Sequence, residues 1–164
     1  MIRFTLLLIA CTHALLALPA ARAQAVARSD EALALALLAK ARQHLSTHGL
    51  DKSVVEFNRL DSPFNSKSSI NPHGDLYLYS VAPDGFQVIH GKNPKIRGKV
   101  MLEMRDADGF YLIREFVRVC FDTKAGKGWV AYKWPNPVTQ HIEPKRGYVE
   151  RVSPDLCLGT GIYQ

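Results

Sequence analysis

The sequence predicts an α+β domain in which a five-stranded antiparallel sheet packs against a long N-terminal helix and a connecting helix. Three observations predict this class. Apolar residues recur at helical spacing early in the chain, they alternate with other residues from position 75 onward, and the last third reads as strands separated by proline turns. The 164 residues suffice for one compact domain.

The first residues resemble a secretory leader. Arg3 precedes an apolar run over 4–18, and Ala21-Arg22-Ala23 fits an A-x-A cleavage site, so we expect a signal peptide over 1–23 and a periplasmic domain over 24–164. A membrane anchor is the competing interpretation, but the run falls short of the roughly 20 residues that span a bilayer. A lipoprotein-type box ending at Cys11 is the other alternative. No later stretch is long and apolar enough for an anchor, so we expect a mature chain without one.

The first predicted helix begins at Ser29, which can cap it, and ends at Gly49. Its inward stripe is formed by five residues at helical spacing, Ala34, Leu37, Leu38, Ala41 and Leu45. A shorter helical piece is expected over 51–58. The polar segment 59–74, rich in Ser, Asn, Pro and Gly, reads as a loop.

A hairpin follows, with strands over 75–81 and 86–90 joined by a turn at 82–85. The connecting helix should come after Gly109, with Ile113, Phe116, Val117 and Cys120 facing inward. Three further strands are expected over 129–134, 141–152 and 156–163. A sheet of this kind buries one face under the long helix and leaves room on the other face for a ligand cavity.

The charge does not favour a nucleic-acid partner. The formal net charge is +6, and loss of the leader removes Arg3 and Arg22 without any acidic residue, which leaves +4. The basic residues are spread along the chain instead of being gathered with aromatic platforms, and export also argues against this partner. We expect these residues to form a solvated surface; the alternative is that one or two of the cations meet an anionic ligand.

Two cysteines remain in the expected mature chain, Cys120 and Cys157. An oxidising compartment makes a disulfide between them plausible, closing a loop of about 37 residues. Two buried free thiols are the alternative, and the sequence leaves both open.

Metal, cofactor and catalytic motifs are weak. His44 and His48 have helical i,i+4 spacing, but no third ligand is near, so we expect two solvated histidines. The run Asp106-Ala107-Asp108-Gly109 imitates part of a calcium loop without its first carboxylate, so we expect a tight turn with Asp108 as a helix cap. The chain has no G-x-S-x-G, C-x-x-C, H-E-x-x-H or glycine-rich phosphate loop, so we expect neither an enzyme nor a cofactor.

The densest aromatic segment is the strand over 128–137. Strand alternation places Trp129 and Lys133 on one face and Tyr132 and Trp134 on the other, so only one pair can line a given cavity. Aromatic walls with a cation suit a small carboxylate. The alternative is that these aromatic residues belong to the core and that Lys133 reaches solvent.

Several motifs together resemble the single Cache domain family, whose fold is PAS-like. They are Gly74-Asp75-Leu76-Tyr77-Leu78, Ile89 to Pro94, Asp106 to Gly109, Gly128 to Pro137, Glu143-Pro144-Lys145, Tyr148-Val149 and Gly159 to Tyr163. Members of this family are extracytoplasmic sensors of chemoreceptors and kinases, often for small organic acids. The resemblance implies pocket residues His90, Trp129, Tyr132, Lys133, Trp134, Lys145 and Tyr148.

We therefore expect a periplasmic sensory domain for a small organic acid or similar metabolite. No transmembrane helix or output segment is evident after the domain, so its signal is expected to pass to a separate membrane receptor or sensor kinase. The alternatives are a structural or interaction protein of the cell envelope with no ligand, and a secreted hydrolase.

Overall fold

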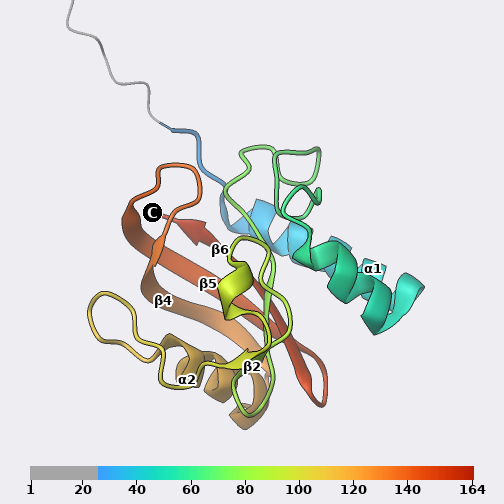
Figure 1. Ribbon diagram of the computed structural model, residues 1–164, viewed down its shortest axis with the longest axis vertical. Helices are drawn as coiled ribbons and strands as arrows, with labels where there is room; N and C mark the ends of the chain where they lie inside the picture. Colours follow the sequence, from blue (N-terminus) through green and yellow to red (C-terminus); the bar gives the residue numbers. More distant parts are fainter. Residues whose placement is uncertain (1–25) are drawn as a thin grey trace, which may run out of the picture.

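A long helix, α1 (Glu31–Asn58), covers one face of an antiparallel sheet in the computed structural model, which describes residues 26–164 (Figure 1). A shorter helix, α2 (Leu112–Val117), covers the other face together with the segments around it. The expected leader over 1–23, including Cys11, lies outside the described residues. Within the described part, no helix combines the length and the apolar character needed to cross a bilayer.

Helix α1 begins one residue later than expected. Asp30, not Ser29, is the N-cap, and its side chain accepts a hydrogen bond from the Leu33 N–H at 2.8 Å. Ser29 instead donates its backbone N–H and its hydroxyl to the two carboxylate oxygens of Asp75, at 2.8 and 2.6 Å. The tie to Asp75 draws Ser29 out of the capping position.

Gly49 divides α1 into the two helical pieces that the sequence predicted. Its φ of 78° and ψ of 173° are far from helical values, and the left-handed φ favours glycine. The first piece buries Ala34, Leu37, Leu38 and Ala41 against the sheet, and the second buries Ser53 and Phe57.

The main sheet has four strands in the order β1-β6-β5-β4. They are β1 (Tyr79–Val81), β4 (Lys127–Pro135), β5 (Ile142–Ser153) and β6 (Leu156–Tyr163). Every pair is antiparallel, so the predicted fold class is confirmed. All eight residues of β6 are buried because this strand lies inside the sheet and both of its faces are covered.

The fifth expected strand, over 86–90, is only partly realised in the main sheet. Its first residues form β2 (Phe86–Gln87), which pairs with β3 (Lys99–Val100) in a separate two-stranded sheet. The following residues run beside β1 through a Tyr79–His90 bridge and a bond from the Ser80 N–H to the Ile89 carbonyl at 3.0 Å. The hairpin therefore forms, but the first residues of its second strand pair with β3 and the last ones pair with β1.

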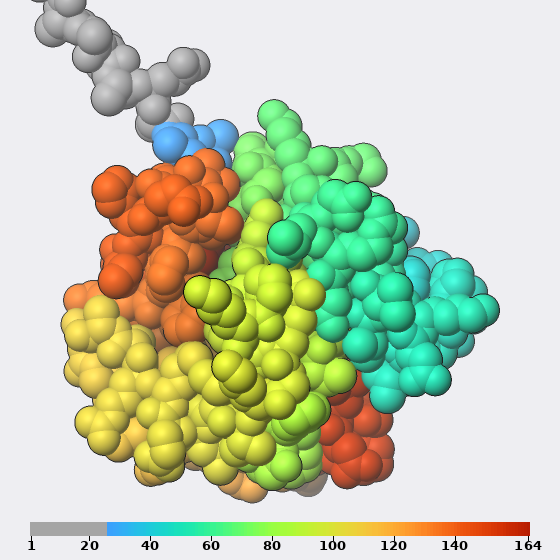
Figure 2. All heavy atoms as spheres, in the orientation of Figure 1, coloured from blue at the N-terminus to red at the C-terminus, as the bar shows by residue number. Residues whose placement is uncertain are grey.

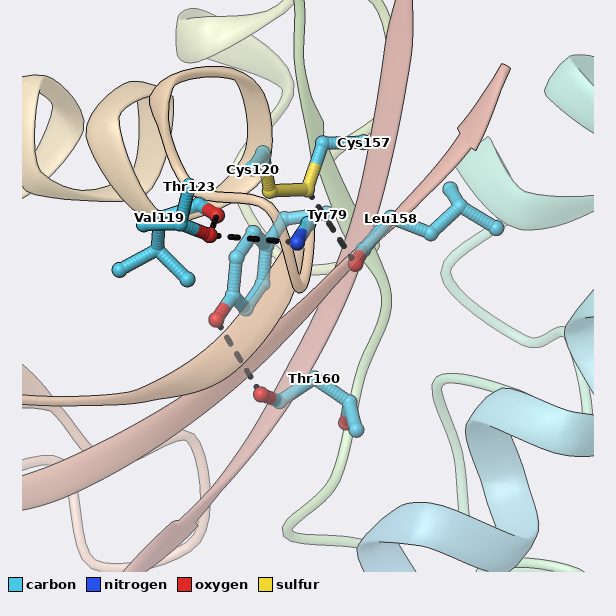
Figure 3. The surroundings of a disulfide bond; sticks show 8 residues. Tyr79, Val119, Cys120, Thr123, Cys157, Leu158 and Thr160 are labelled. Carbon is cyan, nitrogen blue, oxygen red and sulfur yellow. Dashed lines mark hydrogen bonds between the residues drawn. A yellow bond between two sulfur atoms is a disulfide. The ribbon is translucent and has the colours of Figure 1, made fainter.

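The connecting helix continues into a wider turn, η2 (Arg118–Asp122), which a disulfide joins to the sheet (Figure 3). The bond links Cys120 of η2 to Cys157 of β6, with the two Cα atoms 6.2 Å apart. Both cysteines are fully buried. In Figure 3 the Tyr79 ring lies beside the disulfide, and its hydroxyl points along β6 to the Thr160 carbonyl, 3.1 Å away.

The turn before α2 forms as predicted, but Asp108 does not cap the helix. The N-cap position is Tyr111, and it makes no side-chain capping bond. Asp106 organises the turn instead, accepting the N–H groups of Asp108 and Phe110 at 2.9 Å each. Its second oxygen accepts the Lys133 N–H at 2.9 Å, which ties the turn to the edge strand β4.

Alternation along the strands gives the sheet two distinct faces. The face toward α1, here the helix face, carries Leu158 and Ile162 of β6. The face toward α2, here the cavity face, carries Val130 and Tyr132 of β4 and Val149 of β5. The candidate site lies on the cavity face.

Candidate functional site

Two neighbouring hollows lie at the cavity face. The inner cavity is small, with a free volume of about 20 Å³. It is lined by Tyr77, Tyr79, Gln87, His90, Ile96, Met104, Leu112, Ile113, Phe116, Tyr132 and Trp134. The outer groove holds about 350 Å³ and is lined by Tyr77, His90, Lys92, Asn93, Trp134, Pro135, Asn136, Pro137 and Gln140.

Three side chains, those of Tyr77, His90 and Trp134, line both hollows and so form the boundary between them. Figure 2 shows the two chain segments that flank the outer groove, the yellow-green one around residue 92 and the orange one around residue 138, facing each other across a recess. A free volume of 20 Å³ holds about one water molecule, whereas the outer groove is large enough for a small metabolite.

Lys145 lies directly behind Tyr77, on β5, and is only 1% exposed. Its Nζ atom is 3.8 Å from the centre of the Tyr77 ring and 4.6 Å from that of Tyr163, and it donates to the Tyr163 hydroxyl at 3.3 Å. Burial lowers the pKa of the Lys145 ammonium well below its usual value, and the Asp75 carboxylate opposes this change only in part. The amino group lies among aromatic rings, and an anion bound nearby would favour its charged form.

Three glycines make room for this arrangement. A methyl group on Gly159 would lie 2.3 Å from the Tyr79 ring, and one on Gly147 would lie 2.4 Å from the Tyr79 hydroxyl. A methyl group on Gly161 would lie 2.9 Å from the Cε atom of Lys145. The glycines of β5 and β6 therefore let the Tyr79 and Lys145 side chains lie flat against the sheet.

His90 enters the site as a neutral donor. Its Nδ1 atom accepts the backbone N–H of Asn93 at 2.9 Å, so the ring proton of the neutral form is on Nε2. Burial lowers the pKa of His90 to about 3, helped by the positive charges of Lys145 and Arg97. Within residues 26–164 the Nε2 atom has no hydrogen-bond partner, and the side chain lines both hollows.

Gln87 brings a second polar group to the inner cavity, one that the sequence motifs did not indicate. The side chain is 2% exposed, and its Nε2 atom is buried without a hydrogen-bond partner in the described part of the chain. The other such atom, Oγ1 of Thr160, belongs to a residue whose neighbours Leu158 and Ile162 face α1. A polar residue between the apolar Phe86 and Val88 was the available signal.

The charges around both hollows favour an anion. Neither hollow is lined by an aspartate or a glutamate. Lys92 is half-buried at the outer groove and burial lowers its pKa, while the Arg97 guanidinium donates to the His90 carbonyl at 2.8 and 3.0 Å. Among the described residues, no carboxylate forms an ion pair with Lys92, Arg97 or Lys145.

Of the seven residues expected in the pocket, the structure brings three to the hollows and a fourth next to them. His90, Tyr132 and Trp134 line the inner cavity, and Lys145 lies behind Tyr77. Tyr132 and Trp134 pack edge to face, with ring centres 6.2 Å apart. Their shared position follows from the alternation along β4.

The other three lie away from both hollows. Trp129 and Tyr148 are on the helix face, where their rings meet edge to face at 5.1 Å and pack against the α1 cluster. Lys133 lies at the edge of the sheet, where its Nζ atom pairs with Asp108 at 2.8 Å. Trp129, Lys133 and Tyr148 therefore do not lie together with His90, Tyr132 and Trp134 in this structure.

A larger hollow of about 670 Å³ lies on the other side of the molecule, between α1 and the turn that joins β5 to β6. It is open to solvent, and the one charged residue that lines it, Arg42, is already paired with Glu150 at 2.9 Å. Within residues 26–164, no group of three or more metal-ligating side chains is assembled. The Nε2 atoms of Gln87 and His90, which have no hydrogen-bond partner in the described chain and belong to residues that line the inner cavity, mark the cavity face as the candidate site.

Solved structures of related fold include bacterial sensory domains. A methyl-accepting chemotaxis protein from Vibrio parahaemolyticus superposes with a TM-score of 0.62 at 20% identity, over 79% of this chain and 85% of that one. A Cache chemosensory domain solved to explain carboxylic acid recognition gives 0.56 at 23% identity, over 77% and 83%. A periplasmic sensor domain of a chemotaxis protein gives 0.57 at 24% identity, over 81% and 88%. These likenesses support the fold.

Curated relatives are longer signalling proteins. The methyl-accepting chemotaxis protein McpP of Pseudomonas putida is 31% identical over 77 residues, which is 46% of this chain and 14% of McpP. The sensor histidine kinase MctS of Rhizobium johnstonii is 32% identical over 99 residues, which is 58% of this chain and 20% of MctS. The chain thus matches a fifth or less of their length. The family model described as Cache domain matches residues 35–164, so this chain belongs to the Cache domain family.

Proposed function

We propose that this chain is an extracytoplasmic sensory domain that binds a small organic acid at the cavity face. The observation that carries the proposal is Lys145, a lysine 1% exposed that has aromatic neighbours and no carboxylate in ion-pair contact within the described residues. Burying an ammonium group costs roughly several kcal/mol of folding free energy unless a nearby anion offsets this cost. A bound carboxylate supplies that compensation.

The neighbouring donors suit the same ligand. His90 presents its Nε2–H, and Lys145 adds its Nζ–H groups beyond the one that it donates to the Tyr163 hydroxyl at 3.3 Å. A carboxylate accepts up to four hydrogen bonds, so it can use several of these donors at once. One relative of known structure was solved to explain carboxylic acid recognition, which agrees with this ligand class.

Binding requires the boundary between the two hollows to move. The inner cavity of about 20 Å³ is too small for an organic acid, while the outer groove of about 350 Å³ gives access to it. Trp134 lines both, at the end of the edge strand β4, and its ring is 6.4 Å from that of His90. We propose that the ligand enters from the outer groove and displaces the Trp134 ring.

The cellular setting is part of the same proposal. Export by a cleaved leader over 1–23 would place the domain in the periplasm, where the Cys120–Cys157 bond is chemically favoured. Since the curated relatives are a chemoreceptor and a sensor kinase, we propose that occupancy is reported to a separate membrane receptor or kinase.

The test is a thermal-unfolding screen of the purified protein with sodium salts of short organic acids, each matched by its neutral amide at equal ionic strength. An acid at about 100 times its dissociation constant should add about 2.7 kcal/mol of stability, and its amide should not. If no acid and no amide raises the unfolding temperature, the proposal is contradicted.

The small inner cavity favours one alternative, an interaction domain of the cell envelope that has kept the fold and lost its ligand. A free volume of about 20 Å³ is what such a domain would retain. The same screen separates the two functions, because the alternative predicts no stabilisation by any acid. A crystal structure with the inner cavity still closed in the presence of the acids would support it.

A further inference from the structure

The Gln87 side chain is fixed toward the inner cavity by its backbone. Gln87 pairs with Lys99 across β2 and β3, and its carbonyl accepts the Gly98 N–H at 2.8 Å. The neighbouring Phe86 is 37% exposed, whereas Gln87 is 2% exposed, as strand alternation requires. The amide therefore cannot turn to solvent without breaking this pairing.

An unpartnered buried amide is costly. The Nε2 atom of Gln87 is buried and lacks a hydrogen-bond partner within residues 26–164. Ile96, Met104 and Ile113 line the same cavity as Gln87 and offer no side-chain hydrogen bond. Buried polar groups almost always have a hydrogen-bond partner, so we expect a water molecule or a ligand atom to accept a hydrogen bond from this amide.

The inner cavity is the size of one water molecule, and such a water would satisfy the amide while no ligand is bound. Displacing a well-ordered water with an apolar group loses affinity, whereas displacing it with a matching polar group does not. A ligand that enters this cavity is therefore selected for a polar atom at the position that Gln87 faces.

We propose that Gln87 is a specificity-determining residue of the site, which hydrogen-bonds a hydroxyl or keto oxygen that the ligand carries in addition to its carboxylate. The inference rests on the proposed function. The amide both donates and accepts, so it matches a hydroxyl group fully. The ligand class is then a short hydroxy or oxo acid, with Lys145 and His90 serving the carboxylate and Gln87 serving the second oxygen.

The experiment compares propionate with the two enantiomers of lactate by titration calorimetry, because these acids share a three-carbon skeleton and differ by one hydroxyl. In the wild-type protein we expect the better lactate enantiomer to bind at least about tenfold more tightly than propionate. In Gln87→Met the preference should fall to about twofold or less, with propionate binding unchanged or improved.

The matched control is Gln43→Met, the same substitution on the exposed side of α1, which should keep the wild-type preference. If Gln87→Met does not fold, Gln87→Leu and the ratio of lactate to propionate affinity in the wild type still test the role of Gln87. Equal affinities in the wild type, or a preference that survives in Gln87→Met, would overturn the role of Gln87 and leave the proposed function standing. Absence of binding by all these acids and by pyruvate would overturn both.

Discussion

The Nδ1 atom of His90 accepts the backbone N–H of Asn93 at 2.9 Å, so the loop after the hairpin fixes the tautomer of a histidine that lines the candidate site. A backbone N–H cannot be accepted by a protonated ring, which donates from both nitrogens. Together with burial, this contact keeps the imidazole neutral and makes Nε2–H its one donor to the cavity.

The titration of His90 predicts an acid-sensitive fold. Its pKa is about 3 in the folded protein and about 6.5 in an unfolded chain, so below pH 6.5 the unfolded state binds the extra proton. Stability contributed by the neutral ring is complete above pH 6.5 and falls by at most about 1.4 kcal/mol per pH unit as the pH decreases toward 3. His90→Gln should remove this part of the slope. Urea unfolding at several pH values measures it, and parallel curves for both proteins would contradict the assignment.

Replacing Lys145 should separate stability from binding. In Lys145→Met the desolvation cost of the ammonium, several kcal/mol, disappears, while the cation–π interactions that the substitution removes contribute about 2 kcal/mol or less. We therefore expect a free energy of unfolding equal to or about 1 kcal/mol above that of the wild type, and loss of binding of organic acids.

The matched control is Lys133→Met, which removes a lysine that is 42% exposed and paired with Asp108 at the sheet edge. It should change stability by less than about 0.5 kcal/mol and leave binding intact. Chemical denaturation and calorimetry on both variants test the pair. A destabilised Lys145→Met that still binds the acids at wild-type affinity would show that this lysine has only a packing role.

The disulfide should contribute much of the stability. The Cys120–Cys157 bond closes a loop of 37 residues, for which the chain-entropy estimate is about 4 kcal/mol. The double variant Cys120→Ala/Cys157→Ala should unfold at a lower urea concentration by the corresponding amount. Since the bond joins η2 to the sheet beside the Tyr79 ring, its loss should also weaken acid binding. Equal unfolding curves with and without a reductant would contradict a stabilising bond.

Glu143 should make a second acid-dependent contribution. Hydrogen bonds from Arg28, Thr139 and Asn136 lower the pKa of this carboxyl to about 2 in the folded protein. The stability it provides is present above its unfolded pKa, near 4.5, and is lost as the pH falls toward 2.

The variant Glu143→Gln should therefore unfold at a lower temperature than the wild type at pH 7, by a difference that shrinks between pH 4.5 and 2. Differential scanning calorimetry across this range gives the comparison. A difference independent of pH would mean that the substitution acts through packing and not through charge.

The sequence predicted most of the framework because the relevant signals are local. Apolar spacing located both pieces of α1, and Gly49 marked the break between them. Alternation along β4 separated Tyr132 and Trp134, on one face, from Trp129, on the other. It did not tell which face would meet α1, because that choice depends on the packing of distant elements.

The site was harder to predict because its polar groups depend on tertiary contacts. Lys145 resembles a surface residue in sequence, and only the glycines on the neighbouring strand show that its side chain lies against the sheet. Gln87 gave no motif at all. Ser29 and Asp108 were predicted to be helix caps from their residue types. In the structure Ser29 hydrogen-bonds Asp75 instead, and Asp108 belongs to a turn whose backbone N–H groups are bound by Asp106.

The central claim is that an organic anion binds at the cavity face between the sheet and α2. A crystal structure of the protein grown with the tightest-binding acid tests it most directly. We expect the acid in an enlarged inner cavity, with its carboxylate within hydrogen-bond distance of His90 Nε2 and close to Lys145, and with the Trp134 ring displaced. An acid bound instead in the hollow between α1 and the β5–β6 turn, with the inner cavity still closed, would contradict it.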